Sequence, residues 1–297
     1  MANTITLAKK FVPLLDETYQ SQSLTAVLDG DNALVAQGAN AGELIIPRMT
    51  MQGLGDYSRS GGYVEGDVTL TNETVTCNFD RGRMFNVDTM DDMETAGVAF
   101  GRLAGEFIRT KGVPELDAFR LSSYASAAGV STQTGTLEDG AAVIAALRAA
   151  VTKMDEDEVA LEERYLFITP TLHGLIQDMD TTKSREVMDR FAAVVDVPQT
   201  RFYTAIAQKS GKVISTGDST ATDETAGGYG KAAAGKDINF MVIQKAAVIQ
   251  YEKHVAPKIL TPQQNPDADA YKFGYHSVGV AKVQEGKVKG VYVHHKA

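Results

Sequence analysis

Polar and β-forming residues alternate with a period of two over residues 67–79, DVTLTNETVTCNF. This alternation predicts a strand. Residues 43–51, ELIIPRMTM, predict a second strand, in which Pro47 takes a position that an edge strand tolerates. The two strands together predict a long β-hairpin, and Cys77, near the end of the alternating run, is expected to be a buried strand residue.

The stretch around the connection between these strands, MQGLGDYSRSGGYVEGD at residues 51–67, contains five glycines. It is too long for a tight turn, and its residues are too small to pack as an element of their own. Glycine supplies close approach, left-handed turns or mobility. The residues alone leave two interpretations open, a cradle for a phosphate group or a mechanical loop.

A helix is predicted from Thr89 to Lys111, because apolar and small residues recur at steps of three and four. Acidic residues crowd its start and basic residues its end, which complements the helix dipole. Gly112 and Pro114 are expected to end it. Three glycines spaced four residues apart leave one side without side chains, where a strand could cross. The predicted stripe consists of Met90, Met93, Gly97, Phe100, Ala104, Phe107 and Lys111.

The remainder of the chain mixes shorter helical and strand patterns. Residues 113–127 predict a second helix, and Thr136 with Asp139 resembles a capping box that opens a third. Residues 208–236 are polar and rich in glycine, which indicates a surface loop. Further strands are predicted at 164–168, 194–202, 237–244, 255–260, 270–283 and 289–295.

Composition excludes several classes of protein. The chain has 297 residues, 43% of them hydrophobic, enough for one large domain or two modest ones. No run of about 18 uncharged apolar residues occurs, so a membrane-spanning helix is excluded. The first residues lack the features of a secretory signal, and one cysteine fits a reducing compartment, so export is not expected. The net charge of −9, with no basic cluster, disfavours tight wrapping of nucleic acid.

Motifs for catalysis or cofactor binding fail on inspection. Residues 230–237, GKAAAGKD, have the spacing of a phosphate-binding loop, but Asp237 stands where a hydroxyl should bind the metal. GLGDYS at 53–58 departs from the dinucleotide fingerprint at its last glycine. His294 and His295 are adjacent on a predicted strand and cannot share a metal, so terminal exposure is expected for them. We expect no catalytic residue, no cofactor and no metal.

The order of the predicted parts carries more information than any motif. An arm is followed by a long hairpin with a glycine-rich tip, a long helix, and an α/β body that ends in strands. In this order the chain resembles the major capsid proteins of tailed bacteriophages, which have the Hong Kong-type or Johnson fold. The residues that carry the resemblance are IPRMTMQGLGDYSRSGGYVEGDVTLTNETVTCNFDRGRMFNVDTMDDMET, at 46–95, with the signatures GLxDYxRxxGY and DRGxxFxVDxMDxxET.

The resemblance implies an α+β subunit with four parts. These are an N-terminal arm at 1–42, an extended β-hairpin loop at 43–87, a peripheral domain with a long spine helix at 88–160, and an axial domain at 161–297 whose last strands return to the peripheral domain. It also implies a function: a major capsid protein that self-assembles into pentamers and hexamers and forms the icosahedral head around packaged double-stranded DNA. Such a subunit belongs to the virion and is assembled in the cytoplasm of the host bacterium.

The resemblance also favours the mechanical interpretation of the glycine-rich stretch, because the extended loop of such a subunit reaches over a neighbour. The glycines would then supply bending. Tyr and Arg side chains anchor interfaces. The candidate intersubunit contacts are therefore Tyr57, Arg59, Tyr63, Arg81 and Arg83. For each of them the alternative is a locally folded loop with a solvent-facing side chain. The glycines are Gly53, Gly55, Gly61, Gly62 and Gly66.

The implied partners are further copies of the chain, portal and scaffolding proteins, and DNA contacted without sequence preference. Decoration proteins are left open, and no membrane partner is expected. Two alternatives remain at this point. An encapsulin-like nanocompartment has the same fold but encloses cargo enzymes. A soluble α/β nucleotide-binding enzyme would instead bind nucleotide saturably.

Overall fold

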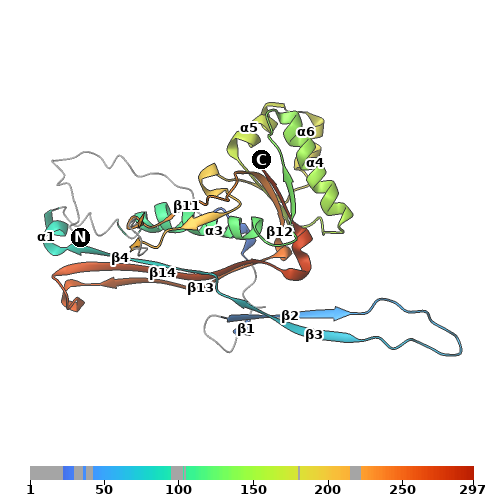
Figure 1. Ribbon diagram of the computed structural model, residues 1–297, viewed down its shortest axis with the longest axis horizontal. Helices are drawn as coiled ribbons and strands as arrows, with labels where there is room; N and C mark the ends of the chain where they lie inside the picture. The colour runs from blue at the N-terminus through green and yellow to red at the C-terminus, as the bar shows by residue number, and fades with distance from the viewer. Residues whose placement is uncertain are drawn as a thin grey trace.

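A computed structural model of the chain describes residues 23–29, 36–37, 43–94, 103, 105–179, 181–214 and 222–297. Most of the predicted arm at 1–42 and the middle of the predicted helix Thr89–Lys111 lie outside the described residues. The molecule consists of a compact body, a long sheet that extends from one side of it and a hairpin that projects from the other (Figure 1).

The body is built on a five-stranded sheet in which β12 is the central strand. The strand order is β5-β15-β12-β6-β7, with β5 parallel to β15, β6 parallel to β7, and the other pairs antiparallel. The bounds are β5 Ser131–Thr134, β15 Val291–His295, β12 Ile238–Gln244, β6 Arg164–Ile168 and β7 Ala193–Asp196. Of these, β5 was not predicted from the sequence, because its short polar run STQT carries no apolar alternation.

Both faces of this sheet are covered. Side chains of β12 alternate between the faces: Phe240 packs with helices α4, α5 and α6, and Met241 packs with α3. All seven residues of β12 are consequently buried. The helices are α3 Val113–Ala125, α4 Gly140–Glu156, α5 Pro170–Met179 and α6 Thr182–Met188. The predicted third helix is confirmed as α4, but its N-cap is Asp139 rather than Thr136, because the Asp139 carboxylate accepts a hydrogen bond from the Ala142 amide at 2.7 Å.

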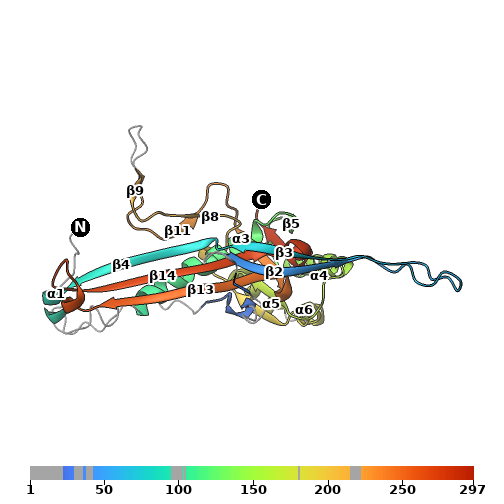
Figure 2. The same ribbon diagram turned by 90° about the horizontal axis from the view of Figure 1, so that it is seen from below.

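A second, longer sheet extends from the body in the order β13-β14-β4 (Figures 1 and 2). Its strands are β13 Val248–Leu260, β14 Ala270–Val283 and β4 Phe79–Asp88, all antiparallel. The sequence did not predict β4, since its charged residues obscure an alternation of more buried and more exposed positions. Cys77 lies in the connection between β3 and β4 and is half-buried, so the prediction of a buried strand residue is wrong.

A helix packs along this long sheet and runs into the body. Residues 105–107 are helical, a π-helical turn η3 follows at Ile108–Gly112, and α3 continues to Ala125. The prediction that Gly112 and Pro114 end the helix is wrong. Gly112 keeps helical dihedrals (φ −65°, ψ −56°), and Pro114 stands at the first turn of α3, where the missing amide proton is tolerated. The short α1, Thr89–Glu94, follows β4 at the far end of the sheet.

The predicted β-hairpin is confirmed. Strands β2 (Glu43–Met51) and β3 (Val68–Thr76) pair antiparallel from Glu43↔Thr76 to Met51↔Val68, and the two-residue β1 (Ala36–Gln37) pairs with the far edge of β2. In both ribbon views the hairpin leaves the body opposite the long sheet (Figures 1 and 2). Its tip, residues 52–67, lies farthest from the body.

A second, smaller hairpin rises from one face of the molecule (Figure 2). Its base pairs β8 (Ile206–Gln208) with β11 (Tyr229–Lys231), and its upper part pairs β9 (Val213–Ile214) with β10 (Thr222–Asp223). It occupies the region predicted as a surface loop. The remaining short helices are η1 Ala26–Leu28, η4 Gln199–Arg201, η5 Lys245–Ala247, η6 Pro262–Gln264 and η7 Glu285–Gly290.

His294 contradicts the expected terminal exposure. It lies in β15 and is only 2% exposed, because β5 pairs outside that strand. Its ring stacks on Phe240 with 5.0 Å between the ring centroids, and its Nδ1 lies 2.9 Å from Nδ2 of Asn239. Burial lowers the pKa of His294, and the charge of His295 lowers it further.

Candidate assembly surfaces

The projecting hairpin exposes apolar side chains that a soluble domain normally buries. Leu54 at the tip is as exposed as in an extended peptide (107%), and Tyr63 is 89% exposed. The hairpin strands add to the same surface. Its other exposed apolar residues are Met49, Met51, Tyr57, Val64, Val68 and Leu70. Several large apolar side chains exposed on one projection indicate an interaction site or an aggregation hazard.

The tip has a defined local turn. Ser58 and Gly62 exchange both backbone hydrogen bonds, at 3.3 and 2.8 Å, and the Gly61 amide donates to the Ser58 hydroxyl at 2.7 Å. Gly62 has a φ of +75°, a conformation that glycine adopts without strain. The rings of Tyr57 and Tyr63 are in contact, with 5.0 Å between their centroids and 55° between their planes. The turn thus presents two tyrosines together at the end of the projection.

The structure separates the five predicted contact residues into two groups. Tyr57, Arg59 and Tyr63 lie at the exposed tip. Arg81 and Arg83 lie on β4 and contact their own subunit. Their role as intersubunit contacts stays a prediction, and their present partners are internal.

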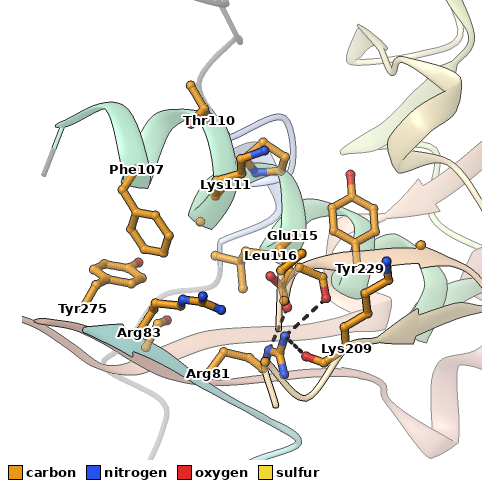
Figure 3. Close-up of a pocket in the computed structure, with 18 of the residues that line it drawn as sticks. Arg81, Arg83, Phe107, Thr110, Lys111, Glu115, Leu116, Lys209, Tyr229 and Tyr275 are labelled. Atoms are coloured by element: carbon orange, nitrogen blue, oxygen red, sulfur yellow. Dashed lines mark hydrogen bonds and ion pairs between the residues drawn. The ribbon is translucent and has the colours of Figure 1, made fainter. Parts of the chain in front are cut away.

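Arg81 joins three segments of the chain. Its Nε pairs with Oε1 of Glu115 at 2.7 Å, and its Nη2 donates to the carbonyls of Lys209 and Gly228 at 2.8 and 3.3 Å (Figure 3). It thereby holds the base of the small hairpin against β4 and α3. Arg83 contributes to the same attachment, because its Nη2 donates to the Thr225 carbonyl at 3.0 Å.

These arginines line a large pocket. The cavity has a volume of about 1170 Å³ and is bounded by β4, β14, the helix at 103–116 and the segment 198–231. An aromatic cluster forms one wall: the Phe107 ring meets Phe85 at 4.8 Å and Tyr275 at 6.0 Å between centroids (Figure 3). Burial raises the pKa of Tyr275. Sequence reasoning missed this pocket, since its lining comes from four distant segments and contains no motif.

The pocket is basic although the chain as a whole is acidic. Among the described residues, six lysines and arginines line it, against two glutamates: Arg81, Arg83, Lys111, Arg201, Lys209 and Lys231 against Glu106 and Glu115. Three of the cations have carboxylate partners, namely Arg81 with Glu115, Arg201 with Asp117 and Lys231 with Asp237. Among the described side chains, no carboxylate lies within ion-pair distance of Arg83, Lys111 or Lys209.

A buried polar cluster fixes the segment at 23–29. The Asp117 carboxylate, fully buried in α3, accepts hydrogen bonds from the Ser23 hydroxyl (2.7 Å), the Leu24 amide (3.0 Å) and the Thr25 hydroxyl (2.8 Å). Arg201 pairs with the same carboxylate at 3.3 Å. Leu28 enters the main core. This part of the predicted arm, residues 23–29, is therefore tied to the body.

Classical catalytic features are not formed by the part of the chain that the structure describes. No three His, Cys, Asp or Glu side chains in it gather as a metal site, and no helix in it is long and apolar enough to span a membrane. The GKAAAGKD segment starts in β11 and is followed directly by β12. It therefore lacks the helix N-terminus on which a phosphate-binding loop depends.

Comparison with known proteins finds relatives by structure and not by sequence. No protein-family model and no curated protein sequence matches the chain. A chain of Mycobacterium phage Che8 is similar with a TM-score of 0.62 and 12% identity, covering 99% of this chain and 96% of that one. The capsid of cyanophage P-SCSP1u gives 0.58 and 13%, covering 98% and 93%. The virus-like particle from Pyrococcus furiosus gives 0.52 and 10%, covering 91% and 97%.

These similarities extend over nearly the whole chain on both sides, so they describe one complete fold rather than a shared fragment. At 10 to 13% identity they show the fold alone. The chain has the mixed α+β fold found in the capsids of tailed phages, as the sequence resemblance predicted.

Proposed function

We propose that this chain is the major capsid protein of a tailed bacteriophage. Copies assemble into pentamers and hexamers that close an icosahedral head around packaged double-stranded DNA. The observation that carries the proposal is the hairpin at 43–76, which projects from the body with an exposed apolar tip. A full-length fold likeness to phage capsids supports it.

The physical argument concerns an incomplete surface. An isolated two-stranded hairpin is marginally stable in water, and within the described residues only the two of β1 extend it on one side. Burial of exposed apolar side chains against a partner stabilises the complex. A second copy of the chain is the partner that symmetric assembly supplies. Each contact of this type is modest, but a closed shell forms many of them at once, and together they stabilise the assembly.

The proposal includes the four subunit parts that the sequence resemblance implies. Residues 1–42 form the arm, 43–87 the extended loop, 88–160 the peripheral domain with its spine helix, and 161–297 the axial domain with strands that return to the peripheral domain. Pairing of β14 with β4 and β13 supports the returning strands. Strand β4 pairs with β14 in the long sheet. Residues 79–87 are therefore the part of the extended loop that joins the loop to the peripheral domain.

The proposal includes partners and a location. Portal and scaffolding proteins would act during assembly in the host cytoplasm, and the finished subunit would reside in the virion. Packaged DNA would be contacted without sequence preference. The acidic balance of the chain supports weak contact, since affinity for phosphate grows with the number of cations presented.

Negative-stain microscopy of the purified protein, alone and with a coexpressed scaffold, tests the proposal. Uniform closed shells are expected from the native chain. A variant in which residues 54–65 are replaced by a two-residue turn should fold as a soluble subunit and form no shells. A Tyr57→Phe, Tyr63→Phe variant keeps both rings and serves as the matched control, with shells expected. A monomer under all conditions would contradict the proposal.

An encapsulin-like compartment is the second candidate, favoured by the similarity to the virus-like particle from Pyrococcus furiosus. Shells isolated from the native source separate the two functions by their contents. Double-stranded DNA inside supports the phage head, and enclosed protein cargo supports the compartment. Among the described residues, no observation favours the nucleotide-binding enzyme.

A further inference from the structure

The pocket beneath the small hairpin presents aromatic rings and positive charges to the same space. Alternate residues of β4 line it, from Phe85 through Arg83 to Arg81, because every second residue of a strand faces the same side. Figure 3 shows Phe107 and Tyr275 at one side of the cavity and Arg81 toward the other. One side of the pocket is therefore an aromatic wall, and the cations continue from it across the cavity.

Much of the positive charge in the pocket is not neutralised by carboxylates. Arg81 pairs with Glu115. Among the described side chains, no carboxylate lies within ion-pair distance of Arg83, Lys111 or Lys209. Lys111 lies on the helix and Lys209 follows β8, so the two exposed lysines belong to different walls. A ligand with several phosphate groups accepts charge-assisted hydrogen bonds from more than one of these cations at once.

The size and composition of the pocket together indicate the class of ligand. Its volume of about 1170 Å³ lies just above the range of roughly 300–1,000 Å³ that is common for sites of small organic ligands, and far exceeds the needs of a single phosphate ion. Nucleobases stack on aromatic side chains, and phosphates pair with arginine and lysine. We propose that the pocket binds a nucleotide, with its nucleobase on the aromatic wall and its phosphates at the three cations that lack carboxylate partners. This inference goes beyond the proposed shell function and concerns binding, not turnover.

Two sources supply this chemistry, a free nucleotide and an unpaired nucleotide at the end of a strand. An intact duplex presents neither, because its bases are stacked and paired. The bound ligand contacts β4, the helix and the foot of the small hairpin, which Arg81 and Arg83 already hold together. The temperature of unfolding should therefore rise with ligand concentration, since the unfolded chain has no such pocket. Affinity should fall as salt rises.

Isothermal titration calorimetry of the purified full-length chain at low salt tests the ligand class. The probes are deoxyadenosine triphosphate, inorganic tripolyphosphate and deoxyadenosine. The nucleoside triphosphate should bind saturably. Tripolyphosphate lacks the nucleobase and deoxyadenosine lacks the phosphates, so each should bind more weakly by about tenfold or more. Equal affinity for tripolyphosphate would overturn the assignment of a nucleotide.

Paired substitutions test the location of the site. Lys111→Ala with Lys209→Ala removes two exposed cations that have no carboxylate partner in the described chain, so the fold should persist while affinity for the nucleoside triphosphate falls by about tenfold or more. Lys183→Ala with Lys287→Ala removes the same charge at exposed positions outside the pocket and should bind like the native chain. Circular dichroism checks the fold of both. Equal affinity of the pocket variant and the native chain, or no binding by the native chain, overturns the site.

A short single-stranded oligodeoxyadenosine with a 5′-phosphate separates the two sources. If it binds more tightly than the nucleoside triphosphate, the strand end is the ligand, and if it binds more weakly, the free nucleotide is. Either result supports the pocket when the Lys111→Ala, Lys209→Ala chain loses the binding. Shell formation is measured separately by microscopy. Failure of this site therefore leaves the proposed function standing, and absence of shells leaves the site standing.

Discussion

The central strand β12 and the hairpin β2–β3 are both well-formed β-structure, but their side chains have opposite surroundings. All seven residues of β12 are buried between two layers of helices. The hairpin leaves Met51, Leu70 and nearly all of its tip exposed. The comparison shows that apolar residues in this chain have two kinds of surroundings: those of the body complete the fold, and those of the hairpin are left exposed, where the proposed assembly would cover them.

The largest loss of stability should come from a substitution in the core of the body. Phe240→Ala removes a fully buried ring that stacks near Tyr292 and His294. The free energy of unfolding should fall by about 3–5 kcal/mol, from lost burial and the cavity left behind. Urea unfolding followed by circular dichroism measures it, with Phe240→Leu as the milder control. An unchanged midpoint would mean that the two-sided core does not hold the body together.

A smaller loss of stability is expected at Asp117, a buried side chain that is held by polar contacts rather than by apolar packing. Asp117→Asn keeps the size of a side chain that accepts hydrogen bonds from the segment at 23–29 and pairs with Arg201. Loss of the charge should cost about 1–3 kcal/mol, because buried donors lose an ionised acceptor. Limited proteolysis should then cut within 23–29 sooner than in the native chain. Ser123→Ala, on the same helix, is the control and should leave the cleavage rate unchanged.

Mild acid should weaken the body through His294. Its pKa lies below the ordinary 6.5 because burial disfavours the charged ring. The unfolded chain therefore binds this proton first, and stability should fall as pH drops below about 6.5. Thermal unfolding at pH 7.5 and 5.5 measures the loss. A His294→Gln chain should show a smaller difference between the two pH values, and an equal difference would refute this assignment.

The smallest effect on the subunit itself should come from the tip. Leu54→Ser removes an apolar side chain that nothing in the described subunit covers, so unfolding free energy should change by less than about 0.5 kcal/mol. Shell yield should nevertheless fall. Sedimentation and unfolding of the same preparation make the comparison. A marked loss of subunit stability would show that the tip belongs to the fold after all.

The sequence predicted the hairpin, α4 and most strands of the body, because each carries a local period or cap. The sequence-based prediction failed where the burial of a residue depends on a segment that is distant in the sequence. His294 is buried because β5, far earlier in the chain, pairs beside its strand, as in the register His294↔Gln133. The candidate site divides in the same way. The tip residues form one continuous stretch with glycines and tyrosines, whereas the pocket gathers cations from separate segments that only the fold brings together.

The π-helical turn at Ile108–Gly112 gives one helix two orientations. Before the turn, Phe107 points to the aromatic residues of the long sheet, and after it, Leu121 and Tyr124 point into the core of the body. A regular α-helix advances about 100° per residue, so the wider turn changes the phase between its two halves. Regular α-helical winding over the same number of residues would turn one half away from its sheet. The turn thus lets one continuous helix pack against the long sheet with one half and into the core of the body with the other.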